Sequence, residues 1–259
     1  MDVKKNKFVA KKKLIKNNLK STTVSQKMKI ETTKITSFMA LSDIVSLLNM
    51  LSGFLSIILS INGYLEYATI SMFFSLLFDS VDGWVARQIN RNDQYGFGKN
   101  IDSLSDVVSF GVAPAILLYS ISKTIPNSPE ILVIGVCMLM VVCGVLRLTR
   151  YNAINDHINF KGFIGFPIPG ISVILGSYYL TGMFNIYAGM ILMVITSLFM
   201  ISDIKYEKVS NIPLIAFGAI LIVLLILPFP IFLFNINIPA LLLLIICLYC
   251  LLSCLLDKL

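Results

Sequence analysis

The chain has 259 residues, of which 57% are hydrophobic and 14% are charged. Its mean hydropathy is +0.85, which excludes a soluble globular domain and a disordered chain and predicts a membrane protein. The five cysteines all fall in apolar runs, so they indicate buried thiols rather than a disulfide framework.

The net charge of +7 originates at the N-terminal end. Residues 1–34 carry eleven lysines and two acids, a charge of +9, whereas the remainder carries −2. A polybasic segment before a first membrane span typically contacts anionic lipid heads, so we interpret residues 1–35 as a basic cytoplasmic tail. The tail lacks the apolar periodicity of a secretory signal peptide. We expect no nucleic-acid partner.

Eight apolar segments follow, each of about 17–25 residues and long enough to cross a bilayer. They are residues 42–62, 66–87, 101–122, 129–147, 166–182, 185–202, 213–233 and 238–256. The sequence therefore predicts an all-α integral membrane protein, a polytopic helical bundle. We divide it into a membrane domain, 36–208, and two additional C-terminal spans within 209–259.

The basic residues predict the orientation of these segments. Alternate loops and both termini hold nearly all lysines and arginines, whereas the opposite loops hold only Lys123. The positive-inside rule then places both termini on the cytoplasmic side of the cell membrane. The polar stretch after the second segment lies on that side too.

The first segment contains an amide, Asn49, within an apolar run. A polar side chain inside a span commonly forms hydrogen bonds between helices, and we favour this role over a substrate contact. Gly53, one turn further on, allows a neighbouring helix to approach closely.

The second and third segments carry four aspartates at membrane depth, where acids are costly and indicate function. With neighbouring residues they form the pattern D-x2-D-G-x2-A-R-x10-G-x3-D-x3-D, made of Asp79, Asp82, Gly83, Ala86, Arg87, Gly98, Asp102 and Asp106. The first two acids share one helix face, and the last two lie one turn apart on the next helix. Two facing helices would bring all four carboxylates together.

Four carboxylates in a dry site repel one another unless a cation joins them. Mg²⁺ or Mn²⁺ suits an all-carboxylate site that leaves room for substrate phosphates, and the absence of His and Cys argues against zinc. We therefore predict that Asp79, Asp82, Asp102 and Asp106 are metal ligands. The alternative is a group of solvated loop acids.

This pattern resembles the signature of the CDP-alcohol phosphotransferases, membrane enzymes that displace CMP from a CDP-linked lipid or alcohol. The later run Arg147–Asn152 and the turn Gly165–Pro169 are similar to the phosphatidylserine synthase branch of that family. The resemblance covers residues 40–208, which implies six family-like spans plus the two extra ones.

The resemblance implies a reaction and a set of roles. The reaction would transfer a phosphatidyl-type group from CDP-diacylglycerol, or from an ether-lipid analogue such as CDP-archaeol, to the hydroxyl of L-serine, and release CMP. Asp106 would act as the general base beside two divalent ions. Gly83, Ala86, Arg87 and Gly98 would contact the CDP-lipid. A homodimer is also implied.

Arg147 and Arg150 lie three residues apart at the cytoplasmic end of the fourth segment. A guanidinium matches a carboxylate or phosphate well, so both are candidates for the acceptor carboxylate or the lipid phosphate. Topological anchoring is the alternative role. The single histidine, His157, is interpreted as a solvated loop residue.

Other functions remain open at this point. The same enzyme class could use glycerol 3-phosphate, inositol phosphate or an amino alcohol as acceptor. A cation-coupled transporter could also use intramembrane acids, although no internal repeat is evident. A catalytically inactive binding protein is disfavoured because every residue of the signature is present.

Overall fold

Helices account for most of the ordered chain in the computed structural model, which describes residues 35, 38–88, 96–154, 162–207, 212–227, 231–233 and 235–256. Residues 1–39 and 40–259 form separate units. The predicted tail lies almost wholly outside the described residues. The helices of the second unit are α2 (Leu41–Ile61), α3 (Leu65–Gln88), α4 (Phe97–Asp106), η2 (Val107–Val112), α5 (Ala113–Thr124), α6 (Glu130–Ile154), α7 (Pro169–Leu180), α8 (Ile186–Ile201), α9 (Ile212–Ile226) and α10 (Ile238–Leu256).

The all-α prediction is confirmed, since a helical segment lies at each of the eight predicted positions. Within the described residues, three segments are long and apolar enough to cross a membrane: Leu41–Ile61, Phe97–Thr124 and Glu130–Ile154. Shorter apolar helices cover Ile186–Ile201, Ala216–Ile226 and Ile238–Leu252. Eight crossings therefore stay a prediction.

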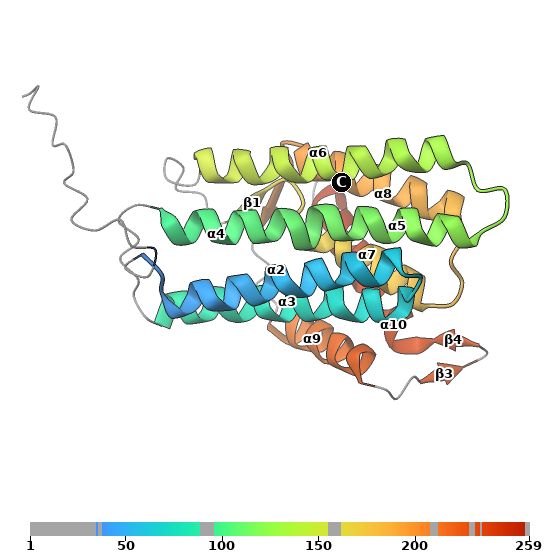
Figure 1. Ribbon diagram of the computed structural model, residues 1–259, viewed down its shortest axis with the longest axis horizontal. Helices are drawn as coiled ribbons and strands as arrows, with labels where there is room; N and C mark the ends of the chain where they lie inside the picture. Colours follow the sequence, from blue (N-terminus) through green and yellow to red (C-terminus); the bar gives the residue numbers. More distant parts are fainter. Residues whose placement is uncertain are drawn as a thin grey trace, which may run out of the picture. The chain divides into compact units, whose positions relative to one another are not determined.

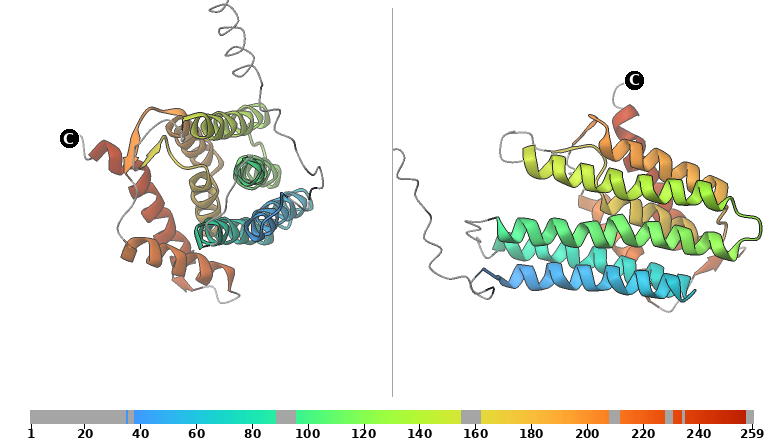
Figure 2. Two further views of the ribbon diagram at one scale, coloured as in Figure 1. Left: turned by 90° about the vertical axis from the view of Figure 1, so that its left-hand side faces the viewer. Right: turned by 45° about the horizontal axis from the view of Figure 1, so that its top comes forward.

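The helical run α4–η2–α5 is central to the bundle. It contacts α2, α3, α6 and α7, and Figure 2 shows these helices around it. Phe110, Leu117 and Leu118 of this run are fully buried. η2 is a π-helical turn, and such turns are frequent at functional sites because they shift the register of the side chains. Here it directly follows Asp106.

Helix α2 shows the inverted polarity of a membrane helix. Its buried face is made of small and polar residues, namely Ser42, Asp43, Ser46, Asn49, Gly53, Ser56 and Ser60. Its exposed face carries large apolar side chains, among them Leu48, Leu51, Phe54 and Leu55. In a bilayer this arrangement is favourable, because small residues let helices approach and polar groups pair in the interior.

Two short antiparallel ladders were not predicted. β1 (Gly162–Ile164) pairs with β2 (Lys205–Glu207) and joins the segment after α6 to the segment after α8. β3 (Phe232–Leu233) pairs with β4 (Ile236–Asn237) before α10. Strands of two or three residues carry too little alternation to be recognised in a sequence.

The predicted seventh segment, 213–233, is helical only in its first part. The helix α9 ends at Ile226, and Phe232 and Leu233 belong to the β3–β4 hairpin instead. Two prolines in the sequence between them, Pro228 and Pro230, account for the early end, because proline cannot donate the helical hydrogen bond. The fifth segment is shorter than predicted as well, since α7 covers Pro169–Leu180.

The helix ends that carry the predicted site residues lie together at one end of the bundle, as Figure 1 shows. The N-terminal ends of α2 and α4 and the C-terminal ends of α3 and α6 lie at one end of the bundle. The predicted site residues of α3, α4 and α6 therefore lie near one another, although they are up to 71 positions apart in the sequence, from Asp79 to Arg150.

The close approach of α2 to η2 can be tested at Gly53. A Cβ added there would lie 2.5 Å from the Ser109 Cα and 2.4 Å from its Oγ, so the helices would have to separate. We expect Gly53→Ala to lower the free energy of unfolding by about 1–3 kcal/mol, the usual cost of overpacking. The measurement is thermal or denaturant unfolding of the purified protein.

Gly135→Ala is the matched control, because a Cβ at this exposed position of α6 has nothing within 4 Å. It should be neutral or slightly stabilising, since alanine favours a helix. Equal stability of the two variants would contradict the packing argument.

Candidate metal centre

Three of the predicted acids form a compact cluster. Asp79 and Asp82 of α3 and Asp102 of α4 each present a carboxylate oxygen, and these oxygens lie within 4.8 Å of one another. Their spacing of three residues on α3 places Asp79 and Asp82 on one face, towards α4. The two facing helices thus bring the acids together as the sequence predicted.

The fourth acid, Asp106, lies beside this cluster, one turn after Asp102 on α4. Its side chain is 8% exposed and interacts electrostatically with the carboxyl group of Asp79. Asp106 also interacts electrostatically with Asp102 and Asp82, so the four predicted acids form one group of neighbouring carboxylates.

Helix α2 holds two of these acids by hydrogen bonds. Ser46 Oγ donates to Asp82 Oδ2 at 2.7 Å, and Asn49 Nδ2 donates to Asp106 Oδ1 at 3.2 Å. Asn49 is fully buried, and its backbone carbonyl accepts a hydrogen bond from Ser109 Oγ at 3.0 Å. The interhelical role favoured for Asn49 therefore involves the acidic cluster itself.

The sequence alone does not predict a role for Ser46. The sequence feature that points to Ser46 is its spacing from Asn49 and Gly53. Steps of three and four residues place these small and polar side chains on one face of an apolar helix. A serine alone is too common within spans to indicate a site.

Arg147 of α6 is placed next to the acids. Its side chain is only 6% exposed, and its guanidinium interacts electrostatically with Asp106 and Asp79. The guanidinium carbon lies 5.5 Å from the centre of the Tyr151 ring, a cation–π distance. A buried positive charge thus faces the acidic cluster from the neighbouring helix.

Arg150 is engaged elsewhere, one turn further along α6. Its guanidinium donates to the backbone carbonyls of Ile164, Met200, Ile201 and Ser202, and to Asp203 Oδ1 at 3.3 Å. These acceptors lie at the C-terminal end of α8 and at the end of β1. Gly165 leaves the room for this contact, because a Cβ there would lie 2.5 Å from Arg150 Nη2. This position favours a structural role for Arg150.

A further link joins α4 to α6 near the arginines. Lys99 Nζ donates to the backbone carbonyl of Asn152 at 3.0 Å. The side-chain Nδ2 of Asn152 donates to Ser103 Oγ at 2.7 Å. Ser103 adjoins Asp102, so this link fixes the distance between the acid-bearing helix and the helix that carries Arg147.

The remaining predicted residues are placed only in part. Gly83 is half-buried directly after Asp82, and Gly98 is half-buried in the first turn of α4. The backbone of Ala86 and Arg87 is helical, but their side chains lie outside what the structure describes. His157 also lies outside the described residues.

The donor set fits a hard divalent cation. Carboxylate oxygens from two helices converge, and no His or Cys belongs to the cluster of described residues. Mg²⁺ and Mn²⁺ prefer such oxygen ligands and retain positions for water and phosphate.

The comparisons with known proteins agree with this geometry. Residues 39–202 match the CDP-alcohol phosphatidyltransferase family. The archaetidylserine synthase of Methanothermobacter thermautotrophicus is 50% identical over 178 residues, which are 69% of this chain and 74% of that protein. The CDP-diacylglycerol–serine O-phosphatidyltransferase of Methanocaldococcus jannaschii is 40% identical over 178 residues, 68% of this chain and 78% of that protein.

A eukaryotic relative shares the same region. The CDP-diacylglycerol–serine O-phosphatidyltransferase of Saccharomyces cerevisiae is 34% identical over 154 residues, 54% of this chain and 53% of that protein. The family match includes all four acids and both arginines, and α9 and α10 lie beyond it. With its apolar helices and its cluster of aspartates, the chain belongs to the CDP-alcohol phosphatidyltransferase family of membrane proteins.

Proposed function

We propose that this protein transfers a phosphatidyl-type group from a CDP-linked lipid to the hydroxyl of L-serine and releases CMP. The observation that carries the proposal is the cluster of Asp79, Asp82 and Asp102 with Asp106 and Arg147 beside it, in a chain whose relatives are named for this transfer. The lipid is CDP-diacylglycerol or its ether analogue, CDP-archaeol.

In the reaction, a bond forms between the serine oxygen and the lipid-side phosphorus, and the bond from that phosphorus to the CMP oxygen breaks. Asp106 accepts the hydroxyl proton as the charge of the nucleophile moves onto the phosphorus. Divalent ions at the four aspartates, two of Mg²⁺ or Mn²⁺, would neutralise the diphosphate and the departing CMP.

The protein side chains position the reacting groups. Ser46 and Asn49 fix the orientation of Asp82 and Asp106 through their hydrogen bonds, so the acids are held before substrate arrives. Arg147 offers a buried guanidinium for the carboxylate of serine or the phosphate of the lipid. Gly83, Ala86, Arg87 and Gly98 are the proposed contacts of the CDP-lipid.

We further propose that the site faces the cytoplasm, as the loop charges predict. A soluble acceptor made in the cytoplasm then reaches the acids directly, while the lipid substrate enters from the membrane. The basic tail, the extent of the membrane domain (36–208) and the homodimer also belong to this proposal.

The proposed reaction is tested by release of CMP. Purified protein in lipid vesicles should release CMP from CDP-archaeol or CDP-diacylglycerol only when L-serine and Mg²⁺ or Mn²⁺ are present. Chelation with EDTA should stop the release, and adding the ion back should restore it. CMP release with glycerol 3-phosphate, inositol phosphate or ethanolamine, but not with serine, would contradict serine as the acceptor.

The role of Asp106 is tested by Asp106→Asn. Asparagine keeps the size of the side chain and cannot accept the proton, so CMP release should fall at least about 100-fold. Binding of the CDP-lipid, measured by isothermal titration, should be retained. Glu130→Gln is the control, because Glu130 pairs with Lys123 at an exposed position and should leave both measurements unchanged. Normal turnover in the Asp106 variant would remove it as the base.

The two arginines are distinguished by conservative substitution to lysine. Arg147→Lys keeps the charge and loses the planar fork, so the KM for serine should rise about tenfold or more with little change in the melting temperature. Arg150→Lys cannot serve the same set of carbonyls, so the melting temperature should fall while the KM for serine stays near that of the unmodified protein. The reverse outcome would make Arg150 the substrate contact and return Arg147 to a structural role.

A further inference from the structure

A cavity lies at the end of the bundle opposite the acids. It has a volume of about 720 Å³ and is formed by the start of α3, the end of α7 with the turn before α8, the end of α9 and the β3–β4 hairpin. The helical rise puts Glu66, on its wall, about 20 Å from Asp79 along α3. Because α9 and the hairpin lie beyond residue 202, the family region and the C-terminal addition build this cavity together.

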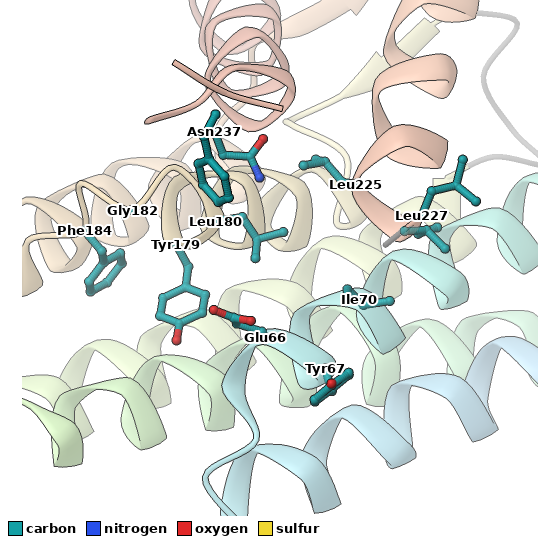
Figure 3. A pocket seen from close by; sticks show the side chains of 12 residues that line it. Glu66, Tyr67, Ile70, Tyr179, Leu180, Gly182, Phe184, Leu225, Leu227 and Asn237 are labelled. Atoms are coloured by element: carbon teal, nitrogen blue, oxygen red, sulfur yellow. The ribbon is translucent and has the colours of Figure 1, made fainter. Parts of the chain in front are cut away.

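Most of the cavity wall is apolar. The side chains that supply it are Ile70, Leu180, Phe184, Leu225, Ile226, Leu227 and Phe232. Figure 3 shows aliphatic side chains of α3, α7 and α9 around the opening. Such a wall suits an alkyl chain rather than a soluble metabolite.

One buried amide provides a hydrogen-bond donor. The Asn237 side chain is 7% exposed, and its Oδ1 accepts a hydrogen bond from the backbone N–H of Ala240 at 3.4 Å, in the first turn of α10. This bond directs Nδ2 towards the cavity, as Figure 3 shows. Within the described residues Nδ2 has no hydrogen-bond partner.

A carboxylate provides an acceptor on the facing wall. Glu66 extends from the first turn of α3 towards the Tyr179 ring in Figure 3, and the two side chains interact electrostatically. Glu66 is the only ionisable acid or base in the described lining, apart from the tyrosines. The cavity therefore presents a neutral donor and an anionic acceptor across from each other.

This pair of groups selects the chemistry of a ligand. A hydroxyl can accept from Asn237 and donate to Glu66, whereas an ammonium has no lone pair for the amide. A phosphate or carboxylate head would be repelled by Glu66. We propose that the cavity binds a neutral membrane lipid, with a hydroxyl-bearing head group between Asn237 and Glu66 and its alkyl chain against α9.

The test uses the full-length protein in phosphatidylcholine nanodiscs, because that lipid head has no hydroxyl. The probe is a monoacylglycerol with a photoreactive diazirine in its chain. We expect crosslinks within residues 179–184, at 225–227 and at Phe232. Unlabelled monoacylglycerol should compete with the probe, whereas an alkyl phosphate and an alkyltrimethylammonium of equal chain length should not.

Asn237→Asp tests the donor. Aspartate keeps the acceptor that caps α10 and removes the N–H groups, so labelling should fall about two- to tenfold, the value of one hydrogen bond. Asn62→Asp is the matched control, because it adds the same charge at the same end of the bundle outside the cavity lining. Its labelling should equal that of the unmodified protein.

Glu66→Gln tests the selectivity separately and does not involve the cap of α10. Glutamine remains an acceptor without the charge, so monoacylglycerol should still bind while the alkyl phosphate now competes. The proposal would be overturned if the Asn237→Asp variant were labelled as strongly as the unmodified protein. It would also be overturned if all three amphiphiles competed equally in the unmodified protein. Either result would indicate a crevice that holds alkyl chains only.

Discussion

The mutual repulsion of clustered carboxylates is the constraint on which this structure depends. At a separation of 4.8 Å and an effective dielectric constant of about 20, two ionised carboxylates repel by about 3–4 kcal/mol. Each of the pairs among Asp79, Asp82 and Asp102 adds a term of this kind. Such a cluster persists only where neighbouring groups or a bound cation compensate.

The surrounding helices supply part of that compensation. Ser46 and Asn49 of α2 donate to Asp82 and Asp106, and Arg147 of α6 brings a positive charge. The donors hold each acid in place, but they do not remove its charge. The remaining negative charge is the physical reason that a divalent cation fits this cluster.

The polarity of α2 follows from the same requirement. An amphipathic helix in water buries its leucines and exposes its serines, whereas α2 buries Ser46, Asn49 and Ser56 and exposes Leu51 and Phe54. Its polar face is directed at the acids and at the backbone of η2. The apolar face is free to contact lipid, so one helix both anchors the protein and organises its centre.

The sequence was sufficient for the helices and the acids because both signals are periodic. The apolar runs predicted a helical segment at every position where one is found, and the three- and four-residue spacing of the aspartates predicted that they share faces. Contacts between distant segments carry no such period. The bond from Ser46 to Asp82 and the β1–β2 ladder depend on how helices pack, which is not encoded locally.

Arg147 and Arg150 show this limit most clearly. Their spacing on α6 predicts that they share a face and a role, yet Arg147 interacts electrostatically with Asp106 and Asp79, whereas Arg150 donates to carbonyls at the C-terminal end of α8. A three-residue step turns a helix by about 300° and advances it by about 4.5 Å, so two neighbours on one face can meet different helices. Helix α8 ends beside Arg150, and its unpaired carbonyls need a donor there.

Helix α3 has a different chemistry at each end, and this difference bears on the C-terminal helices. Its last turns carry Asp79 and Asp82. Its first turn carries Glu66, which lies beside α9 and the β3–β4 hairpin. Helix α9 and the β3–β4 hairpin therefore enclose the end of α3 that lies away from the acidic cluster. Since α9 contacts α3 and α10 contacts α7, a ligand between them would bear on two helices that also flank the central run.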